Sequence, residues 1–394
     1  MHRTVVAVAL LVGCRGDHSK SSPPPVEGVS PAADLPKLPM SADGTAALRE
    51  LDASIDAFRR DATATSRLIS ALLERAGLTQ HVEDYVEALE RSGALVELVP
   101  ENPGAWKVRI TALSRVHRFS DARAALDKLK LVAEDPNDWK QLAATLDEAT
   151  GHPELAAPLR EETAKILVRP ETLTMLAGNL ALRGKLDDAI ALVPKAAASA
   201  HDNPAVLYAW LYFQWGRLSE QAGQMARARD LFAEAHRRMP GYLEAVVHLA
   251  QTMTATGQDP TRLVAEALAA NRHPELLALA GKTAEARTEW ERYLAALPLA
   301  FSDHAARFYL GPGANPARAL ELARSNLANR DTAEARSLVV EAALAAHDPA
   351  LACAQVDPLF TAPLRSQQFV AWRAVSACGR KADADRLATT LGIR

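Results

Sequence analysis

The feature that most constrains this chain is an alanine that recurs about every 34 residues. We place it at Ala88, Ala122, Ala156, Ala189, Ala228, Ala265, Ala286, Ala319, Ala352 and Ala384. Successive members are 34, 34, 33, 39, 37, 21, 33, 33 and 32 residues apart. Five of them follow a glycine by five residues, at Gly151, Gly184, Gly223, Gly281 and Gly379. A unit of this length holds two helices and a turn and cannot bury an apolar face alone, so we predict a stacked array of helical pairs.

The clearest copy of the repeat spans residues 212–240. Its marker residues are Tyr212, Trp215, Gly216, Gly223, Ala228, Phe232 and Pro240. Their spacing resembles the tetratricopeptide repeat, although Ser219 replaces the tyrosine that is usual in that pattern. Gly216 and Ala228 are expected to be small because two antiparallel helices cross there, and Phe232 is expected to fill the groove beside them.

The resemblance covers roughly residues 66–394. It implies an all-α solenoid, built from antiparallel helix pairs and coiled into a right-handed superhelix with a concave groove. The register breaks near Ala265, so residues 258–275 predict an irregular, truncated or distorted hairpin. A helical segment is expected at residues 44–65, and the last helix is expected to cap the array.

The first 14 residues resemble the signal peptide of a bacterial lipoprotein. A basic start precedes ten uncharged residues from Thr4 to Gly13, and Cys14 follows directly. A membrane-spanning helix needs about 20 apolar residues, so this run is too short to cross a bilayer. The final "LVGC" resembles a lipobox, which implies removal of residues 1–13 and lipidation of Cys14. The alternative is a leader that is cut elsewhere, with Cys14 present by chance.

Residues 14–43 predict a disordered tether. Six prolines stand among serine, glycine and charged residues, with almost nothing to bury. At about 3.1 Å per residue such a segment reaches at most roughly 90 Å. Several acyl chains on Cys14 would hold the array to a membrane. In the lipoprotein family Arg15 favours the outer membrane, so we expect a lipid-anchored protein of the bacterial cell envelope that faces the periplasm.

Composition and motifs argue against catalysis and nucleic-acid binding. The 45 basic and 48 acidic residues give a net charge of -3, which provides no polycationic surface for phosphate backbones. The repeats fill almost the whole mature chain, and it contains no His-Glu-x-x-His, GxSxG, P-loop or GxGxxG motif. Adjacent carboxylates such as Glu161 and Glu162 are expected on solvated helix faces. We therefore expect no enzyme, no cofactor and no metal site.

Cys353 and Cys378 are the only cysteines besides Cys14. The repeat places Cys353 in the second helix of one hairpin and Cys378 at the end of the next first helix. Those two ends are adjacent in an antiparallel stack, and export would permit oxidation, so a disulfide is one hypothesis. The alternative is two reduced side chains that pack as small apolar groups.

The candidate partner site lies on the helix expected at residues 207–221. Five of the eight residues from Tyr208 to Trp215 are aromatic, in a chain with 5% aromatic residues. The family pattern turns Tyr212 and Trp215 inward. It leaves four residues facing the groove, namely Trp210, Phe213, Arg217 and Glu220. Trp and Arg are frequent at binding hot spots, but the alternative is a central helix buried on every side.

The other expected groove positions are polar, which favours an extended peptide or protein surface over an apolar small molecule. They are Lys107, Thr111, Arg115, Gln141, Thr145, Glu148, Thr174 and Gln251. The leading hypothesis is a noncatalytic scaffold at the envelope that assists assembly of a protein complex, an assignment based on fold and location alone. One alternative is a solenoid that binds cell-wall glycan or assists an enzyme, with Trp210 and Phe213 stacked on sugars. A cytosolic adaptor with a mistaken start site is a third.

Overall fold

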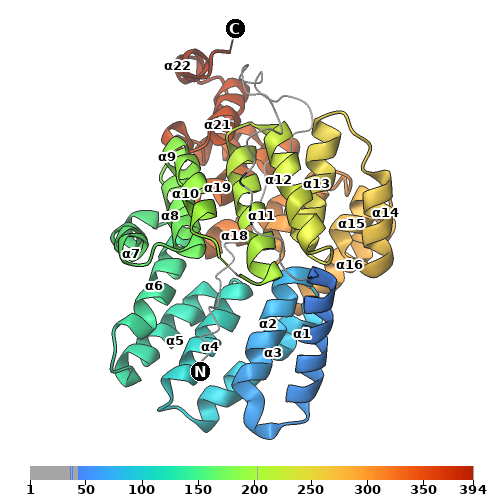
Figure 1. The fold of residues 1–394 in the computed structure, drawn as a ribbon. Helices are drawn as coiled ribbons and strands as arrows, with labels where there is room; N and C mark the ends of the chain where they lie inside the picture. The colour runs from blue at the N-terminus through green and yellow to red at the C-terminus, as the bar shows by residue number, and fades with distance from the viewer. Residues whose placement is uncertain (1–35, 37, 39–42, 202, 394) are drawn as a thin grey trace.

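The protein is an all-α solenoid in the part of the chain that the structure describes. This computed structural model describes residues 36, 38, 43–201 and 203–393. Those residues form helices, turns and connecting segments, and none of them belongs to a β-strand. Within the described ranges, ten antiparallel helix pairs follow one another along the chain (Figure 1).

Each pair joins a first helix to a second helix through a short turn. The first helices are α2 (Thr65–Thr79), α4 (Pro103–Arg115), α6 (Asn137–Ala149), α8 (Pro170–Leu182), α11 (Ala205–Gln221), α13 (Leu243–Ala255), α15 (Pro274–Leu279), α17 (Ser302–Leu310), α19 (Ala333–Ala345) and α21 (Arg365–Ala377). The second helices are α3 (Val82–Leu98), α5 (Phe119–Val132), α7 (Pro153–Ile166), the broken helix α9 (Leu186–Ala191) and α10 (Val193–Ala198), α12 (Met225–Arg238), α14 (Thr261–Ala270), α16 (Thr283–Ala296), α18 (Pro316–Asn329), α20 (Pro349–Ala354) and α22 (Lys381–Leu391). Helix α1 (Gly44–Arg59) and the 3-10 turn Ala62–Ala64 precede the first pair, and a second 3-10 segment, Asp357–Thr361, follows α20.

The recurring alanine lies where the helices of a pair touch. Eight of the ten alanines are 0% exposed, and Ala384 in the last helix is half-buried. The crossing predicted for α11 and α12 is also present, because a Cβ atom added at Gly216 would lie 2.5 Å from Cε1 of Phe232. A larger side chain at these positions would push the paired helices apart, which explains why the repeat keeps them small.

Ala265 is the position where the predicted register is wrong. It is exposed, whereas Val264 is 2% exposed and points into the core. Asp259 and Pro260 are inserted after the turn at Gly257, so α14 begins later and turns a different residue inward. The pair α13 and α14 is complete, and the following first helix, α15, is the short one, with six residues.

A left-handed residue begins each second helix that the recurring alanine marks. The five glycines predicted at turns have φ between 73° and 93°. Four pairs reach the same conformation without glycine, at Gln80 (φ 57°), His117 (φ 55°), Ala314 (φ 48°) and His347 (φ 59°). The last three precede their alanine by five positions, and Gln80 precedes Ala88 by eight. The positive φ at these turns therefore recurs more regularly than glycine does in the sequence.

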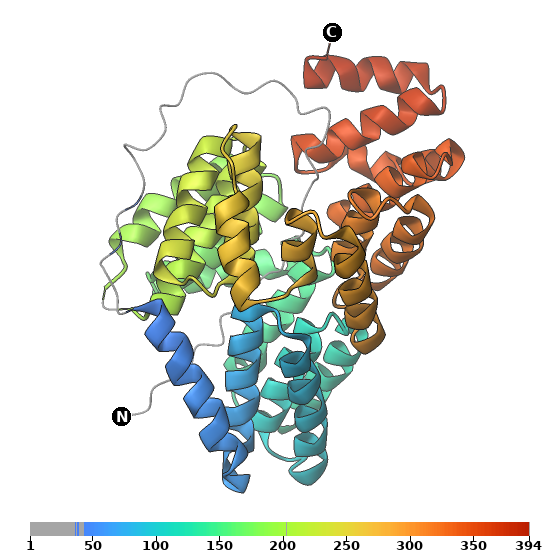
Figure 2. The same cartoon turned by 90° about the vertical axis from the view of Figure 1, so that its right-hand side faces the viewer.

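The array coils so that its later part lies on its earlier part (Figures 1 and 2). Asn271 Nδ2 donates a hydrogen bond to the backbone oxygen of Thr79 at 2.7 Å, and Asn329 Nδ2 donates to that of His117 at 2.8 Å. These partners are 192 and 212 residues apart, so one turn of the coil takes about six repeats. One apolar cluster contains residues of both turns, from α1–α4 and from α15–α19.

Two residues of the expected tether are held by the array. Leu38 is 6% exposed, and both Pro36 and Leu38 bond to side chains of α11 and α12. The expectation of a disordered tether therefore does not hold for Pro36 and Leu38, because the Leu38 side chain packs in an apolar site of the array. Within the described residues, no helix combines the length and apolar character that a membrane crossing requires.

Candidate functional site

A buried ion pair joins α6 to α7. Arg160 is 3% exposed, and its guanidinium forks onto Glu148 through Nε–Oε1 at 3.0 Å and Nη2–Oε2 at 2.7 Å. The same guanidinium donates to Gln141 Oε1 at 2.6 Å and to Thr145 Oγ1 at 3.1 Å. Gln141, Thr145 and Glu148 are spaced four and three residues apart, which places them on one face of α6. One arginine of the second helix thus binds a polar stripe on the first helix.

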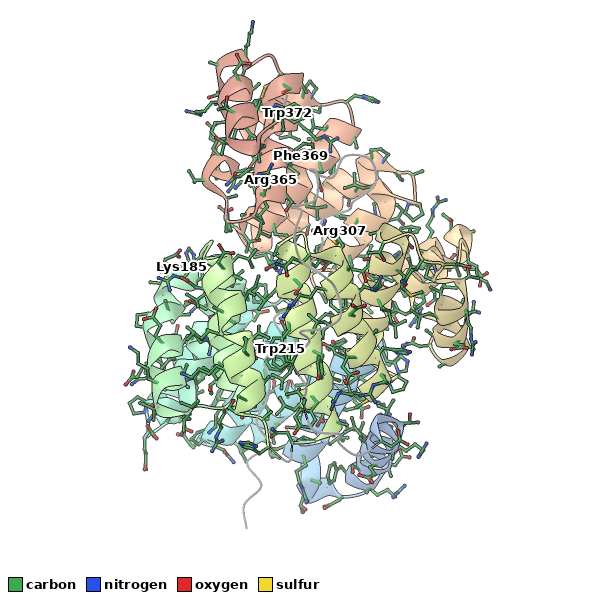
Figure 3. All side chains as sticks on the ribbon, turned by 45° about the horizontal axis from the view of Figure 1, so that its top comes forward. Lys185, Trp215, Arg307, Arg365, Phe369 and Trp372 are labelled. Carbon is green, nitrogen blue, oxygen red and sulfur yellow. A yellow bond between two sulfur atoms is a disulfide. The ribbon has the colours of Figure 1, made fainter. Side chains whose placement is uncertain are left out.

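Helix α8 completes this polar network. Asn179 is 0% exposed, and its Nδ2 donates to Glu148 Oε1 at 2.9 Å and to the backbone oxygen of Pro153 at 2.8 Å. On the other side of α8, Thr174 Oγ1 accepts a hydrogen bond at 3.2 Å from Nε1 of Trp215, the α11 side chain labelled in Figure 3. Polar bonds therefore link four helices, α6, α7, α8 and α11.

A small cavity lies against this network. Its volume is about 20 Å³, which is room for about one water molecule. It is lined by Thr145, Glu148, Arg160, Thr174, Met175, Gly178, Trp210 and Gln214. Three first helices, α6, α8 and α11, supply every lining residue except Arg160. Thr145, Met175 and Gln214 are half-buried, so the cavity lies close to the surface.

Two residues of α11 that line the cavity carry buried hydrogen-bond donors. Trp210 is 5% exposed, and among the described residues neither Trp210 Nε1 nor Gln214 Nε2 has a hydrogen-bond partner. A buried donor without a partner costs about 1–3 kcal/mol, so a ligand oxygen that reached either donor would relieve this cost. Arg160 and Glu148 neutralise each other, so the cavity favours a neutral acceptor such as a carbonyl or hydroxyl oxygen.

Four polar positions expected on the groove wall meet at this site. Gln141, Thr145, Glu148 and Thr174 all belong to the network or line the cavity, and Trp210 of the candidate partner site joins them. The remaining groove positions lie outside it, and Lys107 pairs with Asp138 at 2.6 Å. The polar residues that sequence reasoning missed are Arg160, Asn179 and Gln214, which lie in helices and carry no motif. Buried arginine can be recognised only from its partners in space.

The expectation that Phe213 faces a groove is wrong. Phe213 is 1% exposed, and its ring centroid lies 5.7 Å from Phe232, 5.0 Å from Tyr242 and 5.3 Å from His248. The next hairpin covers this face of α11, so the alternative of a central helix buried on every side describes Phe213 correctly. Trp210 is also too buried to offer its ring face to a partner.

Arg217 and Glu220, the other two expected groove residues, are half-buried near the end of α11. Glu220 Oε2 lies 3.0 Å from His248 Nδ1, which ties α11 to α13. Three of the four residues predicted as one surface therefore lie in different environments, with Trp210 at a cavity, Phe213 in an aromatic core and Glu220 at a contact between hairpins.

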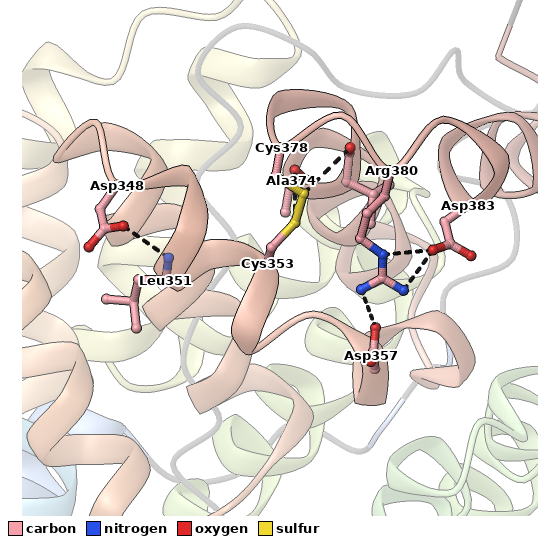
Figure 4. Close-up of a disulfide and its surroundings, with 9 residues drawn as sticks. Asp348, Leu351, Cys353, Asp357, Ala374, Cys378, Arg380 and Asp383 are labelled. Atoms are coloured by element: carbon pink, nitrogen blue, oxygen red, sulfur yellow. Dashed lines mark hydrogen bonds and ion pairs between the residues drawn. A yellow bond between two sulfur atoms is a disulfide. The ribbon is translucent and has the colours of Figure 1, made fainter.

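The C-terminal pairs carry a covalent link. The structure joins Cys353 on α20 to Cys378 at the end of α21, with Cα atoms 6.5 Å apart (Figure 4). Beside it, Arg380 bonds to both Asp357 and Asp383 (Figure 4). Cys14, the predicted lipidation site, lies outside the described residues. Among the described residues there is no group of three or more His, Cys, Asp or Glu side chains placed to hold a metal ion.

Comparison with known proteins gives similarity in structure only. No protein-family model matches the sequence, and no curated protein matches it. The fold is similar to a chain of the APC/C hetero-tetramer Cut9–Hcn1, with a TM-score of 0.46 and 13% identity over 86% of this chain and 66% of that chain. It is also similar to yeast Tom70, with a TM-score of 0.32 and 14% identity over 89% of this chain and 100% of that one. The tetratricopeptide domain of P58(IPK) gives 0.24 and 14% over 89% and 95%. We draw no functional conclusion from these structures.

Proposed function

We propose that this protein is a noncatalytic interaction scaffold that binds a protein or an extended peptide through the cavity formed by α6, α8 and α11. The observation that carries the proposal is the pair Trp210 and Gln214, which line the cavity and whose buried donors, Nε1 and Nε2, have no partner among the described residues. Peptides supply neutral oxygens in every backbone carbonyl and in every amide side chain. Because the cavity holds about one small group, the rest of such a ligand lies over the surface around it.

The location that fits this proposal is the bacterial cell envelope. Its support is the resemblance of residues 1–14 to a lipoprotein leader and the proline-rich tether that follows. An anchored scaffold that binds envelope proteins would assist assembly of a complex at the outer membrane. The glycan-binding alternative has lost its support, because Phe213 and Trp210 are 1% and 5% exposed and cannot stack on sugars.

Crosslinking in native cells tests the binding site. We compare the wild type with a Trp210→Phe, Gln214→Leu double variant, which removes both donors while keeping apolar bulk. Gln251→Leu is the matched control, because Gln251 is a half-buried polar residue of α13 outside the cavity. The proposal expects one protein partner to be captured by the wild type and the control and lost in the double variant at equal abundance. Capture of the same proteins by all three would refute it.

Membrane fractionation tests the anchor separately. Wild-type protein is expected in the membrane fraction, and Cys14→Ser is expected to release it into the soluble fraction. If wild type is soluble, or if Cys14→Ser stays with the membrane, the proposed anchor is wrong while the binding site remains to be judged by crosslinking.

A further inference from the structure

Two described residues that precede α1, Pro36 and Leu38, contact the array through their backbone groups. Tyr212 Oη donates a hydrogen bond to the backbone oxygen of Pro36 at 2.6 Å and accepts one from the Leu38 amide at 3.0 Å. Arg238 Nη2 donates to the backbone oxygen of Leu38 at 3.0 Å. Two side chains of α11 and α12 thus satisfy three backbone groups that lie outside any helix. The Leu38 side chain is buried in the same apolar cluster as both tyrosines of α11.

The two side chains that hold this segment are themselves fixed in place. Arg238 is 5% exposed, and its guanidinium carbon lies 5.2 Å from the Tyr208 ring centre and 5.0 Å from that of Tyr212. Arg238 Nε also bonds to Glu234 Oε1 at 2.8 Å. Burial raises the pKa of Tyr212 above its ordinary value, so its hydroxyl stays protonated and can donate. We call Pro36 and Leu38 the strap, and we call Tyr212 and Arg238, whose side chains bond to them, the strap slot.

These contacts have the form of peptide recognition. The hydrogen bonds go to backbone groups, which every peptide has, and the apolar contact buries one leucine side chain. Tyr and Arg are also residue types that dominate binding hot spots. The hairpin of α11 and α12 makes its main contacts with α8 and α13, so the segment can leave without breaking the array.

We propose that the strap slot is a peptide-binding site for extended segments with a Pro-x-Leu pattern, and that the protein's own Pro36 and Leu38 occupy it as an intramolecular ligand. The inference deepens the proposed scaffold function by naming a second site and the chemistry of its ligand. Leu38 is joined to α1 by a short stretch of chain, so its effective concentration at the slot is high. A partner's segment therefore binds only when the strap is released, which makes the strap autoinhibitory.

Peptide binding to full-length variants tests this inference. The probe is a fluorescein-labelled, end-capped peptide with the sequence of residues 34–40, DLPKLPM. Wild-type protein is expected to bind it weakly, because its own strap competes. Leu38→Asp releases the strap, since a carboxylate is costly to bury in this apolar site, and is expected to lower the Kd at least tenfold. A Kd that does not change would overturn the proposal.

A tyrosine pair on the same helix supplies the matched control. Adding Tyr212→Phe to Leu38→Asp removes the hydroxyl that bonds to two backbone groups and is expected to abolish the gain in affinity. Adding Tyr208→Phe removes a hydroxyl that bonds to Asn203 N at 3.3 Å, and the gain is expected to remain. Equal effects of the two substitutions would show that the peptide binds elsewhere.

Limited proteolysis keeps the inference testable if Leu38→Asp folds poorly. In wild type, trypsin is expected to cleave after Lys20 at least tenfold faster than after Lys37, because the Leu38 amide is bound. Tyr212→Phe is expected to remove that difference, and Tyr208→Phe is expected to keep it. Equal cleavage at both lysines in wild type would overturn the proposal. These outcomes do not depend on Trp210 and Gln214, so the strap slot and the cavity can fail independently.

Discussion

The hairpins α6–α7 and α11–α12 are equivalent units of one repeat, yet they pack through different chemistry. In α11–α12, Gly216 lets the Phe232 ring lie directly against the first helix, and Phe213 adds a further ring contact. In α6–α7, the corresponding space holds the Arg160 guanidinium, bonded to Glu148. Both units keep an alanine with no exposed surface, Ala156 or Ala228.

This difference separates the structural part of the array from the part suited to binding. Rings that interdigitate fill space completely, and their contacts do not depend on hydrogen bonds. A polar network needs a partner for every group, and small mismatches leave unpaired donors and a cavity. Trp210 and Gln214, which carry the unpaired donors, lie on α11 between its aromatic contacts and the polar network of α6–α8. The candidate site is thus located at the boundary between the two kinds of packing.

The largest predicted effect comes from breaking the ion pair. Glu148→Leu leaves the Arg160 charge buried without its carboxylate, and we expect a loss of about 3–5 kcal/mol in unfolding free energy. The double variant Glu148→Leu, Arg160→Met removes both charges and is expected to recover most of that loss. Urea denaturation, with hydrogen exchange to localise the change to α6–α8, measures both. If the single variant lost less than about 1 kcal/mol, the network would not hold these helices together.

The disulfide is a third way to join hairpins and is predicted to have the next largest effect. Cys353 and Cys378 are 25 residues apart, and closing a loop of that length stabilises the folded state by roughly 3 kcal/mol in the chain-entropy model. Reduction is expected to destabilise the C-terminal pairs by that amount and to leave α6–α12 unchanged. In a Cys14→Ser background, unfolded and non-reduced protein should show no free thiol. Two titratable thiols would rule the link out.

Two helix-interior glycines test the aromatic packing. Gly216→Ala places a methyl group 2.5 Å from the Phe232 ring, so the helices must separate, and we expect a loss of about 1–3 kcal/mol. Gly93 in α3 is the control, because a Cβ atom there would be 3.4 Å from the flexible end of Arg109. Gly93→Ala is expected to stabilise the protein by about 0.5–1 kcal/mol through helix propensity. The same sign for both would mean that the close crossing of α11 and α12 is unimportant.

The sequence predicts the parts of this fold that are local. Alanine and glycine spacing identifies the helix crossings and the turns, because those positions tolerate only small side chains or positive φ. Which face of α11 stays exposed depends on contacts with residues that are distant in the sequence. Phe213 is covered by Tyr242 and His248 of the next hairpin, and no pattern within residues 207–221 encodes that contact. Arg160 was missed for the same reason, since its partners lie on another helix.

His117 and His273 are buried in their neutral forms, in contrast to Arg160, which is buried as a cation paired with Glu148. Burial lowers the pKa of His117 to about 4 and that of His273 to about 3, from an ordinary value of 6.5. The folded protein keeps both neutral, while the unfolded chain protonates them below pH 6.5. The two histidines therefore contribute fully to the free energy of unfolding above pH 6.5. Below it, each contribution falls by up to about 1.4 kcal/mol per pH unit until the pH reaches the pKa of that histidine in the folded protein.

Substitution at His117 isolates this effect. Asparagine tolerates the left-handed backbone at that position, so His117→Asn removes the titrating group with little strain in the turn. Wild type is expected to lose about 1 kcal/mol more unfolding free energy than His117→Asn when the pH is lowered from 6.5 to 5.5, because half of the unfolded chains already carry the proton at pH 6.5. Urea unfolding at both pH values measures the difference. Parallel pH dependence of the two proteins would show that His117 is not buried in its neutral form.

The smallest predicted effect concerns the turn that the two compared hairpins share. Both use glycine there, with φ of 93° at Gly151 and 74° at Gly223, whereas α17–α18 uses Ala314 at φ 48°. The left-handed backbone at Ala314 costs about 1–2 kcal/mol in the folded state, because alanine has a Cβ atom. Glycine avoids that strain but loses about 0.5–1 kcal/mol more conformational entropy on folding. Ala314→Gly is therefore expected to raise the free energy of unfolding by up to about 1 kcal/mol. Ala346, at the end of α19 with φ -81°, is the control, because glycine there brings only the entropy loss. Thermal unfolding of the two variants should shift in opposite directions. If both variants lowered the unfolding temperature, the left-handed backbone at Ala314 would carry no strain that glycine relieves.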